Sequence, residues 1–218
     1  LGGDVGQNNS WQVGLAHLNV DVVERSAGGH DHDHGDEEAG AAFSGDSDLT
    51  VLDAVWKTDL GNDRAIILQG EYMWRDEDGQ VTFTEDDEEA LFNYDGDQDG
   101  WYLQGLYQFN RQWRTGLRYD RLSVDNDLVM VSNGITGETD DDIFEESGFE
   151  SSNHDPNRWS AMVDWSPSEF SRLRLQYSRD ESREDADDSK NTNEVYFQCF
   201  GHVFSTCGLT RKVGNFCV

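Results

Sequence analysis

Hydrophobic and polar residues alternate along several stretches of the chain. Within residues 101–109, Trp101, Leu103 and Tyr107 share one side, while glutamines occupy much of the other. A repeat of two positions is typical of a β-strand with one apolar and one polar face. The same pattern predicts about eight strands, at residues 11–23, 51–57, 66–74, 101–109, 113–120, 159–165, 172–178 and 195–204.

The connections between these strands alternate in length. Short turns are expected at 61–63, 110–112 and 166–170, whereas long acidic segments occupy 25–48, 76–98 and 125–156. Soluble domains rarely need structureless loops of about 20 residues. Outer-membrane barrels combine short turns on one side with long loops on the other, and they carry aromatic residues near the strand ends.

These features predict an all-β fold. We expect an antiparallel transmembrane β-barrel, of which this chain supplies about eight strands, with short turns alternating with long acidic loops. A soluble β-sandwich with disordered insertions is the alternative, because a repeat of two positions gives either fold one apolar face.

The composition narrows the possibilities further. The chain has 45 acidic and 16 basic residues, a formal net charge of −29, and 7 tryptophans. This balance argues against nucleic-acid binding, which needs Lys and Arg for phosphate contacts, and it is compatible with collecting cations. Disordered acidic proteins are poor in aromatic residues, so disorder explains the charge but not the tryptophans.

The sequence has no long apolar run of the kind that forms a transmembrane helix, which needs about 18 residues or more. A barrel strand needs only about 10 residues with every second one apolar. The chain starts at Leu1, without an initiator Met or a signal peptide, and we interpret it as a fragment or a processed piece.

A histidine-rich segment lies inside the first long connection. Imidazole binds zinc, copper and nickel, and neighbouring carboxylates favour the approach of a divalent cation. We predict a loop-bound metal site with zinc as the favoured ion, formed by His30, Asp31, His32, Asp33, His34, Asp36, Glu37 and Glu38. The alternative is a solvated low-complexity tract with incidental metal affinity.

Other motifs give weaker indications of metal binding or catalysis. Residues 95–100 imitate the start of an EF-hand loop, but the position of its bidentate glutamate falls on Leu106, within a predicted strand. Calcium binding is therefore expected to be weak at most. His154 could join the zinc site only if the long loops converge. The sequence holds no Ser/His/Asp set, phosphate-binding loop or dinucleotide motif, so we predict no enzyme activity and no covalent cofactor.

Charged residues occupy the polar side of the predicted strands. In a barrel this side faces the interior, where rings of charge set ion selectivity. The same residues could instead only pair across strands and stiffen the wall. The predicted pore-lining residues are Lys57, Glu71, Arg114, Arg118, Asp120, Asp164, Arg172 and Arg174.

The end of the chain, residues 199–218, differs from the rest. It holds Cys199, Cys207 and Cys217 and no acidic residue. An odd number of cysteines fits one disulfide plus a free thiol. The abrupt change in composition fits better with a final strand followed by an atypical tail, such as a frameshift produces.

Four segments carry a family resemblance: GGDVG at 2–6, SWQVGL at 10–15, GWYLQG at 100–105 and SAMVDWSPSEFSRLRLQY at 160–177. Together they resemble a proteobacterial family of zinc-regulated outer-membrane receptors or porin-like proteins. The resemblance implies that residues 1–198 are the C-terminal portion of an outer-membrane barrel with a role in zinc acquisition. It transfers no catalytic residues.

The chain departs from that family pattern in two ways. Its last residues are Phe216, Cys217 and Val218, where such barrels usually end in an aromatic residue. It also contains no plug domain or TonB box, so energy-coupled uptake, as in TonB-dependent receptors, is not supported by this piece.

Pattern and resemblance together predict passage or capture of a divalent cation at the bacterial outer membrane. The His/Asp segment would collect the ion outside, and the charged wall would form its path. The expected partners are outer-membrane lipid, lipopolysaccharide and divalent cations. The alternatives are a general porin without metal preference and a non-transporting surface binding or adhesion protein.

Overall fold

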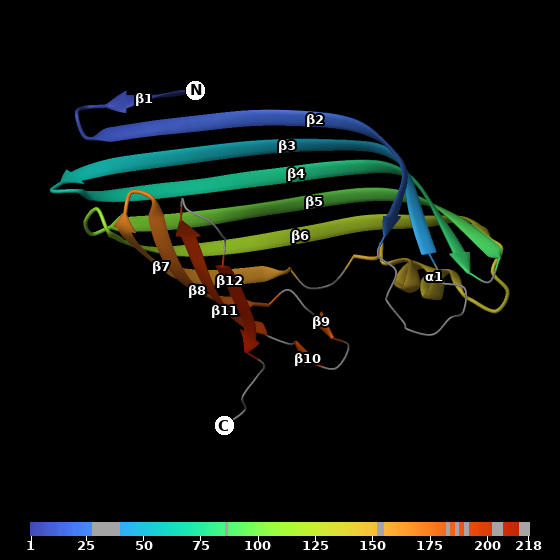
Figure 1. The fold of residues 1–218 in the computed structure, drawn as a ribbon. Coiled ribbons are helices and arrows are strands. Elements are labelled where there is room, and N and C mark those ends of the chain that lie inside the picture. Colours follow the sequence, from blue (N-terminus) through green and yellow to red (C-terminus); the bar gives the residue numbers. More distant parts are fainter. Residues whose placement is uncertain are drawn as a thin grey trace.

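Long antiparallel strands dominate the protein (Figure 1). The computed structural model describes residues 1–27, 40–85, 87–151, 155–181, 184–185, 188–189, 192–201 and 207–213. Its elements are β1 (Gly2–Val5), β2 (Asn9–Ala27), β3 (Gly40–Gly61), β4 (Arg64–Glu85), β5 (Glu88–Gln108), β6 (Trp113–Asn133), α1 (Asp140–Ser147), β7 (Asn157–Ser168), β8 (Ser171–Asp180), β9 (Glu184–Asp185), β10 (Asp188–Ser189), β11 (Thr192–Gly201) and β12 (Cys207–Val213).

Neighbouring strands follow one another in the chain. The main sheet is 10-stranded with the order β1-β2-β3-β4-β5-β6-β7-β8-β11-β12, and β9 pairs only with β10. Every pair is antiparallel. Among the described residues no ladder joins β1 to β12, so the sheet is curved but open (Figure 1). The prediction of an all-β antiparallel fold is confirmed, with two more strands in the sheet than the sequence pattern suggested.

The three predicted short turns lie between consecutive strands at one end of the sheet. In the first of them Gly61, Asn62 and Asp63 have positive φ angles of 75°, 54° and 60°. Glycine adopts this conformation without steric cost, and Asn and Asp tolerate it better than other residues do. The residue types in the turn therefore permit a two-residue connection between β3 and β4.

The long loop predicted at 76–98 is wrong, because β4 continues to Glu85 and β5 begins at Glu88. The predicted loops at 25–48 and 125–156 are also shorter than expected, since β2 reaches Ala27, β3 begins at Gly40 and β6 reaches Asn133. The period of two continues through these acidic stretches, with aspartates on the outward face of β4 and Val81 and Phe83 on the inward face. The high proportion of charged residues therefore led to a prediction of loops where the structure has regular strands.

In the half of the sheet next to the short turns, apolar side chains are more exposed than their polar neighbours. Leu103 is 58% exposed and Leu117 is 63% exposed, whereas Asp164 on the opposite face is 1% exposed. We call the outward apolar side chains the apolar belt: Val13, Leu15, Leu52, Ala54, Ile66, Leu68, Leu103, Leu117, Val163 and Leu175.

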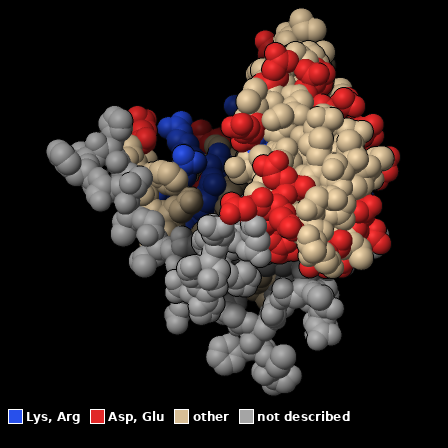
Figure 2. Space-filling view, turned by 90° about the vertical axis from the view of Figure 1, so that its right-hand side faces the viewer, with Lys and Arg blue, Asp and Glu red and all other residues tan. Residues whose placement is uncertain are grey.

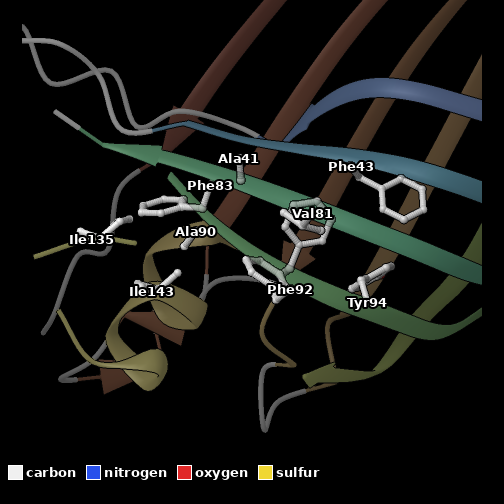
Figure 3. Packing of buried hydrophobic residues seen from close by; sticks show 10 residues of the cluster. Ala41, Phe43, Val81, Phe83, Ala90, Phe92, Tyr94, Ile135 and Ile143 are labelled. Atoms are coloured by element: carbon white, nitrogen blue, oxygen red, sulfur yellow. The ribbon is translucent and has the colours of Figure 1, made fainter. Parts of the chain in front are cut away.

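Beyond the apolar belt the polarity of the two faces reverses. Here the inward face packs a small hydrophobic core, which includes Phe43, Phe83 and Phe92, all 1% exposed or less (Figure 3). Ile143 of α1 is 1% exposed in the same cluster. The connection between β6 and β7 therefore folds against the inward face at the end of the sheet opposite the short turns.

The helix α1 is defined by its caps. Thr139 and Asp142 form a reciprocal capping box, and Gly148 ends the helix with a φ of 73°. Among the described residues, no helix has the length and apolar character needed to cross a membrane.

Candidate functional site

The inward face of the sheet gathers the predicted pore-lining residues. Cross-strand pairing aligns Glu71 with Tyr102 and Tyr102 with Asp120, and it aligns Arg114 with Asp164 and Asp164 with Arg174. Lys57 pairs with Ile67 on the same face. Figure 2 shows Lys and Arg side chains inside the hollow of the molecule and many acidic side chains on the surrounding surface.

Asp164 on β7 organises three arginines from the two neighbouring strands. Arg114 Nε donates to Asp164 Oδ2 at 3.0 Å, and Arg174 Nε donates to Asp164 Oδ1 at 2.7 Å. Arg172 lies farther away, with Nη1 3.8 Å from Asp164 Oδ2. One carboxylate thus faces three guanidinium groups, so this arginine cluster keeps an excess of positive charge.

Other charged residues of the wall form one-to-one contacts. Arg118 Nε donates to Asp120 Oδ1 at 2.8 Å, and its guanidinium lies 3.6 Å from the ring centroid of Tyr102. Arg158 Nε donates to Asp180 Oδ2 at 3.0 Å. Glu71 accepts a long hydrogen bond from Tyr102 Oη at 3.4 Å. These contacts hold the side chains against the wall, as the alternative of cross-strand pairing also requires.

Polar cavities open along the described part of this wall. One of about 280 Å³ is lined by residues that include Gln104, Arg118, Arg158, Ser160 and Gln176. A smaller one of about 140 Å³ lies beside Asp164 at the short-turn end. A face that combines charged groups with room for water can border an aqueous path.

Aromatic rings border the apolar belt on both sides. Toward the short turns, Trp113 and Trp165 stack at 6.0 Å between centroids, and Tyr107 lies 4.8 Å from Phe109. On the other side, three aromatic contacts follow neighbouring strands: Tyr72–Trp74, Trp101–Tyr119 and Tyr119–Trp159.

The height between the two aromatic borders suits a membrane. On β4 the outward face runs from Ile66 to Trp74, which at about 3.3 Å per residue is about 26 Å along the strand. At a tilt of about 40° this becomes roughly 20 Å, close to the apolar band of about 25 Å in outer-membrane barrels.

Aspartates line up on the outward face beyond the belt. Cross-strand pairing forms two aspartate rows, one of Asp21, Asp46, Asp78, Asp95 and Asp127 and the other of Asp48, Asp76, Asp97 and Asp125. A hydrogen bond with Asp21 and the charge of Asp21 raise the pKa of Asp46. A hydrogen bond with Asp97 is the main cause that raises the pKa of Asp76. The rows therefore hold carboxylates close enough to repel.

A buried ion pair on the inward face was missed by the sequence reasoning. Glu77 is 1% exposed and accepts hydrogen bonds from Arg25 Nη2 and Ser47 Oγ, both at 2.8 Å. Arg75 Nε lies 3.7 Å from Glu77 Oε1. Residues 76–98 were expected to form a loop, so no sequence pattern predicted that Glu77 would pair with Ser47 of β3.

The predicted metal site cannot be placed on this wall. His30, Asp31, His32, Asp33, His34, Asp36, Glu37 and Glu38 lie outside the described residues, as does His154. Residues 95–100 belong to β5, so they form no calcium loop. Within the described part of the chain, no group of three or more His, Cys, Asp or Glu side chains is arranged to hold a metal ion.

Comparison with known proteins gives one relative. The chain is 31% identical over 163 residues to an uncharacterized protein of Aquifex aeolicus (strain VF5). The match covers 75% of this chain but only 30% of the relative's length. No protein-family model matches the chain, and no solved structure matches it. The resemblance to zinc-regulated outer-membrane receptors therefore stays a prediction.

Proposed function

We propose that this sheet is part of the wall of an outer-membrane β-barrel whose inward face borders a water-filled path. The observation that carries the proposal is the inverted exposure of the two faces in the apolar belt. Leu103 and Leu117 are more than half exposed, while Asp164 and Ser178 on the inward face are each 1% exposed. In a bilayer the outward side chains would meet acyl chains and the charged face would meet water.

A soluble sandwich explains the same residues less well. It would need a second layer to cover the apolar belt, and in the described chain the hydrophobic core with α1 lies on the opposite face, beyond the belt. An uncovered apolar surface this large on a soluble protein is a site of association or aggregation. In a bilayer, acyl chains would cover this surface, so it would not drive aggregation.

Among the described residues β1 and β12 are the open edges of the sheet, so a closed barrel needs either pairing between these two strands or further strands. We infer that a longer chain supplies them. The relative from Aquifex aeolicus has the length for additional strands, since the present chain covers 30% of it.

Within such a barrel we propose passive passage of small charged solutes along the inward face. The paired wall residues leave polar cavities rather than an apolar core in the belt region. A general porin and a divalent-cation path both fit this wall. Single-channel conductance measured with and without zinc distinguishes them, because a general porin should show no effect of zinc. An adhesion protein would show no conductance, but it would attach to cells in a way that depends on the loops.

Divalent-cation capture by residues 30–38 is the second candidate function. The segment connects β2 to β3 at the end of the sheet that carries the aspartate rows, so the field there favours cations. Replacing His30, His32 and His34 by Gln should lower the zinc affinity of the purified protein. Unchanged affinity would show that the segment is no zinc site.

The membrane proposal is tested by a matched pair of substitutions in the belt. Leu103→Arg places a charge on the outward face, and we expect it to oppose insertion into lipid vesicles by about 2–4 kcal/mol. Gln104→Arg places the same charge on the inward face and should insert normally. Equal insertion of both variants, or loss of both, would contradict the assignment of the two faces.

A further inference from the structure

The arginine cluster is a basic feature of the described part of the inward wall, in a molecule whose outer surface is strongly acidic. Arg114, Arg172 and Arg174 surround the single carboxylate of Asp164, in a chain whose net charge is −29. Asp164 is already engaged by Arg114 and Arg174 through the hydrogen bonds of both its oxygens. Among the described residues, the guanidinium of Arg172 makes a distant ionic contact with Asp164 and lies over the ring of Phe200.

A polar cavity opens beside this cluster. It has a volume of about 140 Å³, and its lining includes Asn110, Arg111, Arg114, Asp164, Ser166 and Arg172. At about 30 Å³ per water in the liquid, that space corresponds to several water molecules. Guanidinium, amide and hydroxyl groups dominate the polar lining, so the cavity is richer in hydrogen-bond donors than in carboxylates.

We propose that this cavity binds a small oxyanion and gives the short-turn end of the path a preference for anions. The planar guanidinium fork matches the oxygens of phosphate, sulfate or carboxylate in pairs. The proposal rests on the proposed function, because it assigns a solute class to the inward face of the barrel. It also departs from the cation path that the sequence predicted.

The three arginines at the cavity have different roles. Arg114 holds Asp164, and Arg111 Nε donates to Asp63 Oδ1 at 2.9 Å, so both already have carboxylate partners. The side chain of Arg172 is 40% exposed and its guanidinium lies 5.3 Å from the ring centroid of Phe200. Arg172 is therefore the residue placed to donate to an incoming anion.

The test uses the closed barrel, formed by the longer chain with its additional strands, and inorganic phosphate as the probe. Phosphate affinity is measured in detergent by calorimetry, and the chloride-to-potassium permeability ratio is measured in planar bilayers. Arg172→Gln should weaken phosphate binding about tenfold, the usual contribution of a charge-assisted hydrogen bond. It should also shift the permeability ratio toward potassium. Arg172→Lys keeps the charge without the fork and should give an intermediate affinity.

Arg64→Gln is the matched control, because Arg64 lies at the same end of the sheet and, two residues before Ile66 in β4, shares its outward face. It should leave phosphate affinity and permeability ratio unchanged. Equal phosphate affinity in wild type and Arg172→Gln, or no phosphate binding by wild type, would overturn the anion site. A wild type that binds phosphate without conducting would instead uphold the site and refute the proposed channel.

Discussion

Glu77 shows how a single residue depends on its neighbours at the inward face. Its carboxylate lies between Arg25 and Arg75, on the strand opposite Ser47. Burial raises the pKa of Glu77, but hydrogen bonds from Arg25 and Ser47 and the charge of Arg75 lower it by more, so the pKa falls below its ordinary 4.5. The charged form is the one that the folded protein favours.

We predict that Glu77→Gln lowers the free energy of unfolding by about 2–3 kcal/mol near neutral pH. A fully buried pair would lose about 3–5 kcal/mol, and the partial exposure of Arg25 reduces the loss. Because the folded pKa is lowered, the wild-type advantage is present above pH 4.5 and is lost as the pH falls through the lowered pKa. Urea unfolding across this range measures both effects.

Asp78→Asn is the matched control for that experiment, since Asp78 follows Glu77 in β4 and lies outward in an aspartate row. Its substitution removes a repulsion and should not destabilise the protein. An equal loss of stability in both variants would contradict the role given to the buried pair.

Asp46 has the opposite pH dependence. The hydrogen bond with Asp21 and the charge of Asp21 raise the pKa of Asp46 above its ordinary 3.8, so ionisation disfavours the folded state. We predict that Asp46→Asn raises the unfolding midpoint in urea at neutral pH. The gain should shrink as the pH falls below the raised pKa and vanish below 3.8, and a gain that persists in acid would refute this cause.

At the scale of elements, the outward face of both β4 and β5 changes from apolar to acidic along the strand. Near the short turns their outward residues are apolar, as at Leu68 and Leu103, and the next outward residues beyond Trp74 and Trp101 are aspartates. The inward face changes in the opposite sense, from Gln69 to Val81. One regular strand can therefore cross an apolar layer and continue into water on the far side.

The belt strands could be predicted from the sequence, because alternation of Leu or Trp with polar residues is a local signal. Their extensions could not, since rows such as Asp76 and Asp78 suggested solvated loops. The signal that could have found them is Val81 and Phe83 alternating with Gln80 and Thr82. The phase of the apolar positions shifts there, and a shifted phase is easily mistaken for the end of a strand.

The candidate site was predictable residue by residue but not as a cluster. Each charge on the polar side of a strand was expected to face inward, which the register supports. That Arg114, Arg172 and Arg174 converge on Asp164 depends on the register across β6, β7 and β8. Turn length and bulges set that register. The bulge between Trp165 and Ser168 could not be predicted from the sequence.

The connection between β6 and β7 provides a prediction for a single element. Ile143 is the buried apolar residue of α1 in the inward core, and Phe144 beside it packs against the same cluster. We predict that Ile143→Ala lowers the local free energy of opening of residues 134–151 by about 2 kcal/mol or more. Hydrogen exchange of these amides measures the change, and Glu145→Ala on the exposed side of α1 is the control. Unchanged exchange in Ile143→Ala would show that the helix is not anchored there.

At the scale of the whole molecule, the surface is divided along the strands. Aromatic rings frame the apolar belt, the aspartate rows lie beyond one border, and the arginine cluster lies on the inward face near the other. A soluble protein has no reason to keep this order, because water is the same at both ends. A protein crossing a membrane meets an apolar layer with a different aqueous side at each border.

The central claim is that the outward face of the belt touches lipid and the inward face touches water. Single cysteines at positions 103–107 of β5, in a chain whose native cysteines are replaced, can carry a fluorophore in lipid vesicles. We predict that odd positions are quenched by brominated lipid and even positions by an aqueous quencher, alternating along the strand. Aqueous quenching at all five positions, or no alternation, would contradict the account.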